Sequence, residues 1–316
     1  MKNELNSNVS FNIIDVGSDN DTLEKVANYL SCSQNIYCIN PNKRDLDNQE
    51  IYFKKNNKVN FKKLNYAVSE SPGKINFYIT KNDTASSIYE PNQEILKRYR
   101  TDNIFDVVEK KEIQCENLEN IFNVENIKNI DLLLLYCQAS ELNIIRGAEK
   151  ILEKISVIHT DASFIEKYKG QPLFDDCVSY LSKKNFKFIG FTHTRSVDGN
   201  LIEVRALFLN KYLNKHNNIL NAAKILMHFN FLWEAKWLLH DNNFEKEIYH
   251  KLVNVKMKKM KLLFKIMSSM VLKIMSLNNG YIKKILYPLI PIIKKIKIGR
   301  NFLIYLDSLN QNTKYK

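Results

Sequence analysis

Short apolar runs alternate with amphipathic stretches between residues 11 and 210 of the chain. The apolar runs have strand length, and they are FNIIDVG (11–17), NIYCIN (35–40), FKKLNYAV (61–68), KINFYIT (74–80), DLLLLYC (131–137), SVIHTDASF (156–164), FKFIGF (186–191) and RALFLN (205–210). Strands that alternate with helices predict an α/β domain with a mostly parallel sheet. The last two runs fit an antiparallel edge, which mixed sheets often have.

Two amphipathic stretches in this region predict helices from their apolar spacing. Residues 141–155 (ELNIIRGAEKILEKI) form one of them. Residues 21–30 form the other, and its apolar face consists of Leu23, Val26, Ala27 and Leu30.

The pattern becomes wholly helical after residue 211, which predicts three parts: an α/β domain (1–211), a helical hairpin (212–250) and a basic amphipathic tail (251–316). The hairpin resembles a single tetratricopeptide-like unit, and one such unit cannot build a solenoid. It is therefore expected to cap the α/β domain. Its predicted inward face consists of Ala222, Leu226, Phe229, Leu232, Ala235 and Leu238.

Composition places the chain among globular proteins, since 316 residues with 45% apolar content suffice for a sizeable core. The five cysteines are odd in number and follow no metal-ligand spacing, which favours a reduced interior and predicts no metal site. The polar start MKNELNSNVS lacks the apolar segment of a secretory signal. These features predict a cytoplasmic protein.

The net charge of +13 is concentrated near the end of the chain. Residues 251–306 hold 13 Lys and Arg side chains and no Asp or Glu, while the remainder is balanced at 34 of each sign. A nucleic-acid binder would spread this charge over its folded surface, so nucleic acid is a weak candidate partner. The uncharged runs of this segment are too short to span a bilayer.

Two interpretations of residues 251–306 stay open. A basic amphipathic helix can lie on an anionic membrane surface, which would place the protein at the inner face of the membrane. Alternatively, the segment packs on its own domain or on a partner and leaves its lysines in solvent. RNA binding is a weaker third interpretation because aromatic residues are sparse in this segment.

The first candidate for chemistry is the stretch IIDVGSDNDT, residues 13–22. An apolar strand that ends in Asp15 is followed by Gly17 and a helix start. Backbone N–H groups and the positive end of the helix are then left beside whatever binds there. Such a turn holds a nucleotide-like cofactor, although Asp-x-Gly after a strand is by itself a weak signal.

Six segments, in this order along the chain, resemble the FkbM family of S-adenosylmethionine-dependent methyltransferases. They are DVGSDND (15–21), INP (39–41), AVSESPG (67–73), TASSIYEPN (84–92), LLYCQASELNIIRGAEKIL (134–152) and TDASFIEKYKGQPLF (160–174). The resemblance implies an α/β fold with a Rossmann-like class I methyltransferase sheet, mostly parallel with an antiparallel edge. The helical residues after 211 then form a C-terminal extension.

The resemblance also implies S-adenosylmethionine as the cofactor. The cofactor-binding residues that it implies are Asp15, Gly17, Ser18, Asn40 and Val68. Asp21 replaces a family glycine, and its side chain and charge crowd the approach of a carboxylate-bearing ligand. Asn40 replaces the acid that would bind the ribose hydroxyls, and an amide accepts such a bond without charge assistance.

On the acceptor side, the family's Lys, Asp and Gly are replaced by Leu134, Tyr136 and Ala139, while Gln138, Ser140 and Glu141 remain. With an ordinary pKa of about 10, a tyrosine stays protonated at neutral pH unless a nearby cation stabilises the phenolate. The candidate catalytic residues are Glu141, His159, Asp161 and Tyr136. His159 or Asp161 is expected to supply the base for methyl transfer to a hydroxyl.

Each of these residues also has a purely structural interpretation. Glu141 can stabilise a helix N-terminus, which is worth about 0.3–1 kcal/mol, and His159 can be a core histidine bonded to a neighbour. The segment KYKGQPLF (167–174) is either a positioning loop over the acceptor or a tight turn. TASSIYEPN (84–92) is either a lid or an ordinary polar loop.

The sequence thus supports two functional hypotheses. The first is an O-methyltransferase that acts on a hydroxyl, in a sugar of a surface glycan or of a related natural product. The second is a catalytically inactive methyltransferase fold that serves as a scaffold and docks on a membrane or a glycan-assembly partner through its basic tail. The replacements at Asp21, Asn40 and Tyr136 keep the second hypothesis open.

Overall fold

A computed structural model describes residues 10–17, 20–30, 32–99 and 102–244 of the protein. Ser18 and the basic tail, residues 251–316, lie outside the described residues, as do residues 245–250 of the expected hairpin. In the described part of the chain, no helix is both long enough and apolar enough to cross a membrane.

The main sheet has seven strands in the order β3-β2-β1-β7-β8-β10-β9. Their bounds are Val59–Leu64 (β3), Gln34–Ile39 (β2), Phe11–Val16 (β1), Ile130–Leu135 (β7), Ile155–Ser163 (β8), Asn200–Asn210 (β10) and Phe186–Val197 (β9). The first five strands are parallel, and β10 runs antiparallel to both β8 and β9. The predicted α/β class with a mostly parallel sheet and an antiparallel edge is therefore confirmed.

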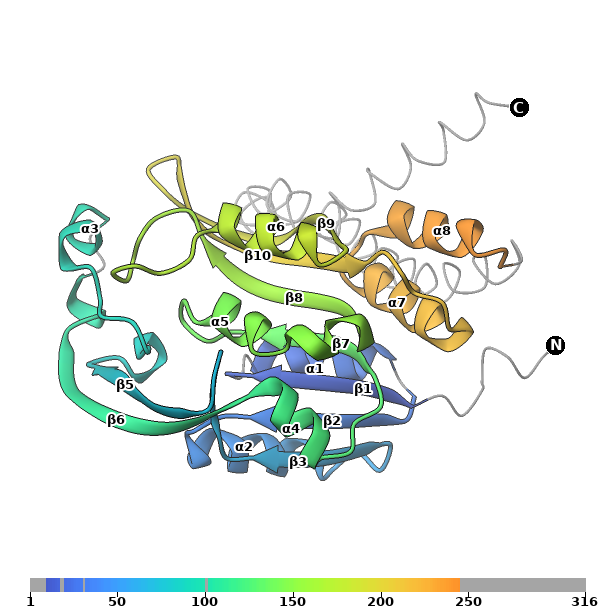
Figure 1. The fold of residues 1–316 in the computed structure, drawn as a ribbon, viewed down its shortest axis with the longest axis horizontal. Helices are drawn as coiled ribbons and strands as arrows, with labels where there is room; N and C mark the ends of the chain where they lie inside the picture. Colours follow the sequence, from blue (N-terminus) through green and yellow to red (C-terminus); the bar gives the residue numbers. More distant parts are fainter. Residues whose placement is uncertain (1–9, 18–19, 31, 100–101, 245–316) are drawn as a thin grey trace, which may run out of the picture. The chain divides into compact units, whose positions relative to one another are not determined.

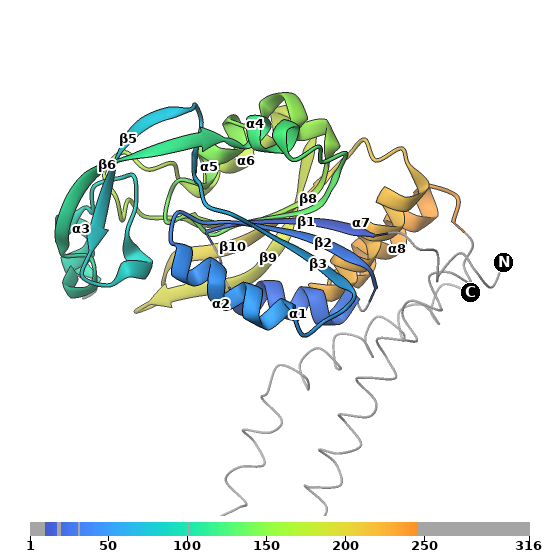
Figure 2. The ribbon, with the colours of Figure 1, turned by 90° about the horizontal axis from the view of Figure 1, so that it is seen from below.

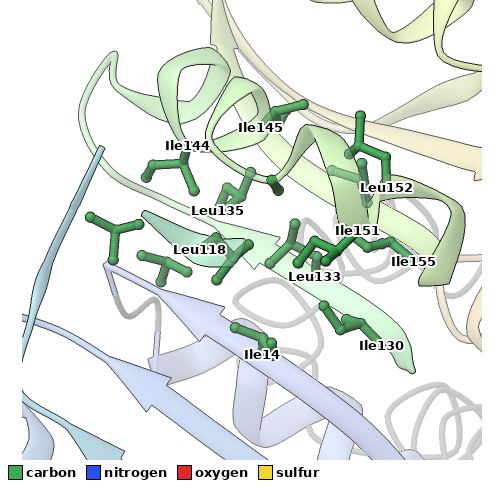
Figure 3. Close-up of a cluster of buried hydrophobic side chains, with 14 of the residues drawn as sticks. Ile14, Leu118, Ile130, Leu133, Leu135, Ile144, Ile145, Ile151, Leu152 and Ile155 are labelled. Atoms are coloured by element: carbon green, nitrogen blue, oxygen red, sulfur yellow. The ribbon is translucent and has the colours of Figure 1, made fainter. Parts of the chain in front are cut away.

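Helices cover both faces of this sheet, which explains why its central strands are continuous apolar runs. All six residues of β7 are buried. One face carries α1 (Asn20–Leu30), α2 (Lys43–Phe53) and α7 (His216–His228), and the other carries α4 (Leu118–Val124), α5 (Glu141–Arg146) and α6 (Phe174–Lys183), as Figure 2 shows. Between the second group of helices and the sheet, a core of Ile and Leu side chains is packed (Figure 3).

A smaller sheet lies beyond the carboxyl ends of the parallel strands (Figure 1). Its order is β4-β6-β5, with bounds Ala67–Ser69, Val107–Asn117 and Gly73–Thr80, and it is joined by α3 (Gln93–Arg98) and the 3-10 turns Asp83–Ala85 and Asp102–Ile104. The Ser87 hydroxyl donates to the Gln138 carbonyl oxygen over 2.5 Å, which fastens this layer to the turn after β7. Ser87 thus has a structural contact within the segment TASSIYEPN.

The helix expected at residues 141–155 is interrupted. Helix α5 ends at Arg146, and a 3-10 helix follows from Glu149 to Lys154. Gly147 lies between them, where a Cβ would approach the Ser69 carbonyl oxygen to 2.6 Å. The chain therefore passes too close to β4 for any residue but glycine, and glycine is a poor helix former.

The predicted helical region after residue 211 contains α7 and α8 (Leu232–Asp241). Helix α7 packs against β7, β8 and α1, so it is a layer of the α/β domain as well as one arm of a hairpin. Asn230, with φ of +70°, makes the turn between the two helices. Of the expected inward face of α8, Ala235 is buried, whereas Leu238 is half-buried and Leu239 is buried in its place.

Candidate active site

Gly17 forms the turn at the carboxyl end of β1 and lies directly against the turn after β7. Its φ is +88°, and its N–H donates to the Ile39 carbonyl oxygen at the end of β2 over 3.0 Å. A Cβ here would lie 2.3 Å from the Tyr136 carbonyl oxygen. Only glycine fits between these backbones, so β1, β2 and β7 end at one place.

Asn40 follows β2 at the same edge of the sheet. It is only 6% exposed, and its Oδ1 accepts the N–H of Asn42 over 2.8 Å. Asn42 is itself the N-cap of α2, so the amide of Asn40 is fixed by the start of that helix. An amide oxygen has two lone pairs, so Oδ1 has the capacity to accept a second bond from a ligand hydroxyl.

Two other predicted cofactor-binding residues, Asp15 and Val68, and the replaced glycine position, Asp21, differ in their surroundings. Asp15 is fully buried, and Gln49 Nε2 lies 3.5 Å from its Oδ2. Asp15 therefore has a structural role below the surface of the turn that Gly17 forms. Val68 is buried in the hydrophobic core on β4. Asp21 is exposed and forms an ion pair with Lys25 one helical turn later, which partly compensates the charge expected to repel a ligand carboxylate.

Tyr136, at the position of the family's Asp, belongs to a ring of contacts in which a chain of hydrogen bonds starts at the Arg205 side chain and ends at the Arg205 backbone carbonyl. Its hydroxyl lies 2.6 Å from His159 Nδ1, and His159 Nε2 lies 2.6 Å from Thr192 Oγ1. Thr192 Oγ1 donates to the Arg205 carbonyl oxygen over 3.4 Å. Arg205 Nη1 donates to Thr22 Oγ1 over 2.9 Å, and Thr22 bonds to the Tyr136 hydroxyl.

One direction of proton donation satisfies every member of this ring. Thr22 donates to the Tyr136 oxygen, Tyr136 donates to Nδ1, and Nε2–H donates to Thr192, which requires a neutral His159. Burial, together with the charges of Arg205 and His228, lowers the pKa of His159 to about 3, in agreement with this tautomer. Burial also raises the pKa of Tyr136 well above 10, although Arg205 opposes that shift. Both side chains are therefore neutral near pH 7.

Thr192 reaches His159 because of a β-bulge. In the pairing of β10 with β9, Arg205 lies opposite His193 and Ala206 lies opposite Phe191, so Thr192 is the extra residue. A bulge of this kind re-aims a side chain, and here it brings Thr192 Oγ1 to His159.

Glu141 is the first residue of α5 and is 4% exposed. Its Oε1 accepts the N–H of Cys137 over 2.6 Å, which closes the turn after β7. Burial and, to a smaller extent, the nearby charge of Asp161 raise the pKa of Glu141, while the backbone hydrogen bonds and Lys167 oppose the shift, with a result of about 8. At neutral pH the carboxyl therefore holds its proton for most of the time.

Asp161 lies on β8, directly opposite Arg205 of β10. Its Oδ1 accepts a bond from Arg205 Nε over 3.1 Å. Burial raises its pKa most, and the charge of Glu203 adds to the shift, while Arg205 and Lys167 oppose it, with a result of about 7. Asp161 is thus poised to change protonation state near neutral pH.

The structure brings Asp161 and Glu141 together in the wall of one small pocket. Glu203 and two residues of the GQPLF segment, Gln171 and Pro172, also line this pocket. His159 and Tyr136 are not among its lining residues, because their polar atoms face each other and the Thr192 bulge. The geometry therefore favours Asp161 over His159 as the base.

Gln171 has a fixed orientation within the pocket wall. Its Oε1 accepts the N–H of Tyr168 over 2.8 Å, so its Nε2 has to face the other way. The residue is 6% exposed, and within the described ranges its Nε2 has no hydrogen-bond partner. The segment is thus a tight turn, with Gly170 at φ of +69°, and it also contributes an amide donor to the pocket wall.

Four phenylalanines pack together in a cluster, and one of them directly follows a pocket-lining residue in the sequence. Phe164 follows Ser163, a lining residue, and its ring stacks on Phe174 with centroids 5.0 Å apart. Phe188 and Phe191 complete the cluster at 5.1 Å from each other. Phe164 and Phe191 are each 38% exposed, so the cluster presents an aromatic surface to solvent.

The sequence did not reveal Arg205, Thr192, Glu203 or Lys167 as site residues. All four come from the antiparallel edge or the loop before α6, and their positions depend on strand register. Lys167 is buried and pairs with Glu203 over 2.5 Å. In the described ranges no group of three or more His, Cys, Asp or Glu side chains is arranged to hold a metal ion.

Comparison with known proteins finds a matching family. A sequence profile described as the methyltransferase FkbM domain matches residues 11–188. No curated protein matches the chain. Among solved structures, the chain is similar to M. capricolum TrmK in complex with the natural cofactor product S-adenosyl-homocysteine, with 12% identity, 96% of each chain covered and a TM-score of 0.35.

The strand order and the turns at its carboxyl edge define a class I methyltransferase fold. The profile match covers more than half of the chain. The chain belongs to the FkbM family of methyltransferases, and it is an S-adenosylmethionine-dependent enzyme.

The residues at the edge of the sheet fit this cofactor in two respects. Gly17, with φ of +88°, follows β1 just before α1 begins at Asn20, and the start of a helix after a strand is where a carboxylate or phosphate group binds in α/β sheets. Asn40 keeps an amide oxygen with a second lone pair at the ribose position. Gly17 and Asn40 are therefore the residues that would hold S-adenosylmethionine.

Proposed function

We propose that this protein methylates a hydroxyl oxygen, in a sugar of a surface glycan or of a related natural product. The observation that carries the proposal is Asp161, a carboxylate in a pocket wall whose pKa of about 7 suits proton abstraction at neutral pH. A hydroxyl has to lose its proton as it is methylated. The sugar class itself comes from the family resemblance.

When bound, S-adenosylmethionine supplies a methyl group on a positively charged sulfur. Asp161 would accept the acceptor's proton as the acceptor oxygen bonds to the methyl carbon, while the S–CH3 bond breaks and its electron pair stays on the sulfur of S-adenosylhomocysteine. Arg205, which bonds to Asp161 over 3.1 Å, holds the carboxylate in place. Glu141, whose pKa is about 8, stays largely protonated and so limits the negative charge of the pocket.

Two further features support a sugar hydroxyl as the acceptor. The buried Nε2 of Gln171 is a donor that a hydroxyl oxygen in the pocket can satisfy, while the hydroxyl proton points to Asp161. The exposed rings of Phe164 and Phe191 offer an aromatic surface to the apolar face of a sugar ring or of a natural product.

The test combines calorimetry with transfer of a radiolabelled methyl group. The purified full chain is titrated with S-adenosylmethionine and S-adenosylhomocysteine, then incubated with labelled cofactor and a panel of free sugars and glycans. Asp161→Asn is expected to keep the cofactor affinity and to slow transfer by about 10²–10⁴-fold. Asp198→Asn, at an exposed hairpin position with φ of +47° that Asn tolerates, is the matched control.

The pH dependence gives a second readout. Transfer is expected to rise between about pH 6 and 8, as Asp161 loses its proton, and then to level off. Binding of cofactor together with unchanged transfer by Asp161→Asn would show that another group is the base. Absence of cofactor binding in the wild-type protein would support the scaffold hypothesis instead.

A further inference from the structure

Helix α8 carries a row of exposed aromatic rings along one side. Trp233 is 53% exposed and Trp237 is 41% exposed, and their ring centroids lie 5.7 Å apart in a T-shaped arrangement. His240 extends the row, with its ring 5.2 Å from that of Trp237. Spacings of four and three residues put these side chains on one face of the helix.

A helix that only caps the α/β domain would bury its largest apolar side chains against that domain, and α8 does not. Helix α8 buries Ala235 and Leu239 and leaves its two largest apolar side chains, Trp233 and Trp237, about half exposed to solvent. Single exposed apolar residues are ordinary, but adjacent exposed indoles mark an interaction surface. No step of methyl transfer uses these rings.

The charged side chains around the row balance one another, since Asp241 at the end of α8 pairs with His240 over 3.2 Å, and the positive charge that suits an anionic partner comes from the sequence after α8. Lys236 places its Nζ 5.1 Å from the centre of the Trp233 ring. Glu234, which lies between the two tryptophans in sequence, is paired with Lys187 over 2.9 Å. Ten residues after α8 ends, the sequence enters residues 251–306, with 13 Lys and Arg side chains and no Asp or Glu.

We propose that α8 docks on an anionic membrane surface, with Trp233 and Trp237 in the headgroup region. Indole rings favour the boundary between lipid and water because they are apolar with one polar N–H group. Neighbouring Lys and Arg side chains attract anionic headgroups, at about 1 kcal/mol for each charge near the surface. The tryptophan row then contributes apolar insertion and the basic segment contributes electrostatic attraction, and stable peripheral binding requires two such contributions.

Fluorescence tests this proposal directly, because Trp233 and Trp237 are the only two tryptophans of the chain. The full-length protein is mixed with vesicles of phosphatidylcholine alone, or of phosphatidylcholine with roughly 30% phosphatidylglycerol. The anionic vesicles are expected to sediment the protein and to shift its tryptophan emission to shorter wavelength. Brominated lipid is expected to quench that emission, and about 0.5 M salt to release the protein.

The variant Trp233→Ser/Trp237→Ser is expected to bind anionic vesicles about tenfold more weakly, as measured by sedimentation. Ile51→Ser is the matched control, because Ile51 is 60% exposed on α2 and its loss removes apolar surface elsewhere. The control is expected to bind like the wild type. Far-UV circular dichroism of both variants checks that they are folded.

Several outcomes overturn the proposal. Sedimentation with anionic vesicles but an unchanged emission spectrum would show that the basic segment binds without α8. Equal binding to neutral vesicles, or no binding to anionic ones, would exclude the membrane surface. An emission shift with a single-stranded RNA and none with vesicles would assign the row to nucleic acid. Loss of methyl transfer has no bearing on this test, so it is independent of the proposed function.

Discussion

Replacing Glu141 by Gln removes a buried carboxyl whose titration links the stability of this protein to pH. The folded-state pKa of about 8 lies above the ordinary value of 4.5, so the folded protein holds this proton more tightly than the unfolded chain does. The resulting stabilisation is complete below pH 4.5 and is lost as the pH rises through 8.

The magnitude follows from the two pKa values. The gap between 4.5 and about 8, at about 1.4 kcal/mol per pH unit, corresponds to at most about 5 kcal/mol of unfolding free energy. Gln keeps an oxygen that can accept the Cys137 N–H, and it does not ionise. The variant is therefore expected to lose much less stability than the wild type between pH 6 and pH 9.

Urea unfolding at pH 6, 7, 8 and 9 measures this difference, provided that the m-value stays constant among the variants. Glu94→Gln is the matched control, because Glu94 is exposed on α3, where it forms an ion pair with Arg98. The control is expected to follow the pH dependence of the wild type. If Glu141→Gln also shows the wild-type pH dependence, the pKa of the Glu141 carboxyl is not raised by burial. The proposal that a protonated Glu141 limits the negative charge of the pocket would then be refuted.

The remaining predictions concern the two turns that meet at the edge of the sheet. Tyr136→Phe is expected to lower the free energy of unfolding by about 1–3 kcal/mol in the same urea assay, because it leaves the buried Nδ1 of His159 without a donor. Tyr180→Phe is the control, because the buried Tyr180 hydroxyl has no hydrogen-bond partner among the described residues. This control is expected to be neutral or slightly stabilising. Gly17→Ala is expected to cost more than about 3 kcal/mol and to abolish calorimetric cofactor binding, since its Cβ would meet a carbonyl oxygen at 2.3 Å. Gly199→Ala, at φ of +83° with nothing within 4 Å, is expected to cost only about 1 kcal/mol, and equal losses at the two glycines would contradict the steric argument.

The sequence predicts the strands that have an apolar pattern and misses β6, for a physical reason. Strands such as Ile130–Leu135 are buried on both faces, so they appear as continuous apolar runs. Strand β6, Val107–Asn117, is mostly exposed and rich in Glu and Lys, and no apolar pattern marks it. Its place depends on pairing with β4 and β5, which local sequence does not encode.

The same distinction holds at the site. The sequence identified Asp161 as a candidate base because it lies in the family-like segment TDASFIEKYKGQPLF (160–174). Arg205 contacts Asp161 because of the antiparallel register of β10 with β8, and Thr192 contacts His159 because of the bulge of β9. The partners that decide whether His159 or Asp161 faces the pocket were therefore not accessible from the sequence, which left both as candidate bases.

The replacement of the family's Asp by Tyr136 is best understood together with Arg205. The guanidinium lies 4.8 Å from the centre of the Tyr136 ring and also bonds to Asp161. An ionised carboxylate at position 136 would compete with Asp161 for this one cation, and the pKa of Asp161 would rise as its partner was drawn away. With a neutral ring there, Arg205 remains committed to Asp161, whose pKa then stays near neutrality. Asp161 on β8 thus takes the place of the acid that is missing from the turn after β7. The single substitution Tyr136→Asp would disturb the bond between Asp161 and Arg205.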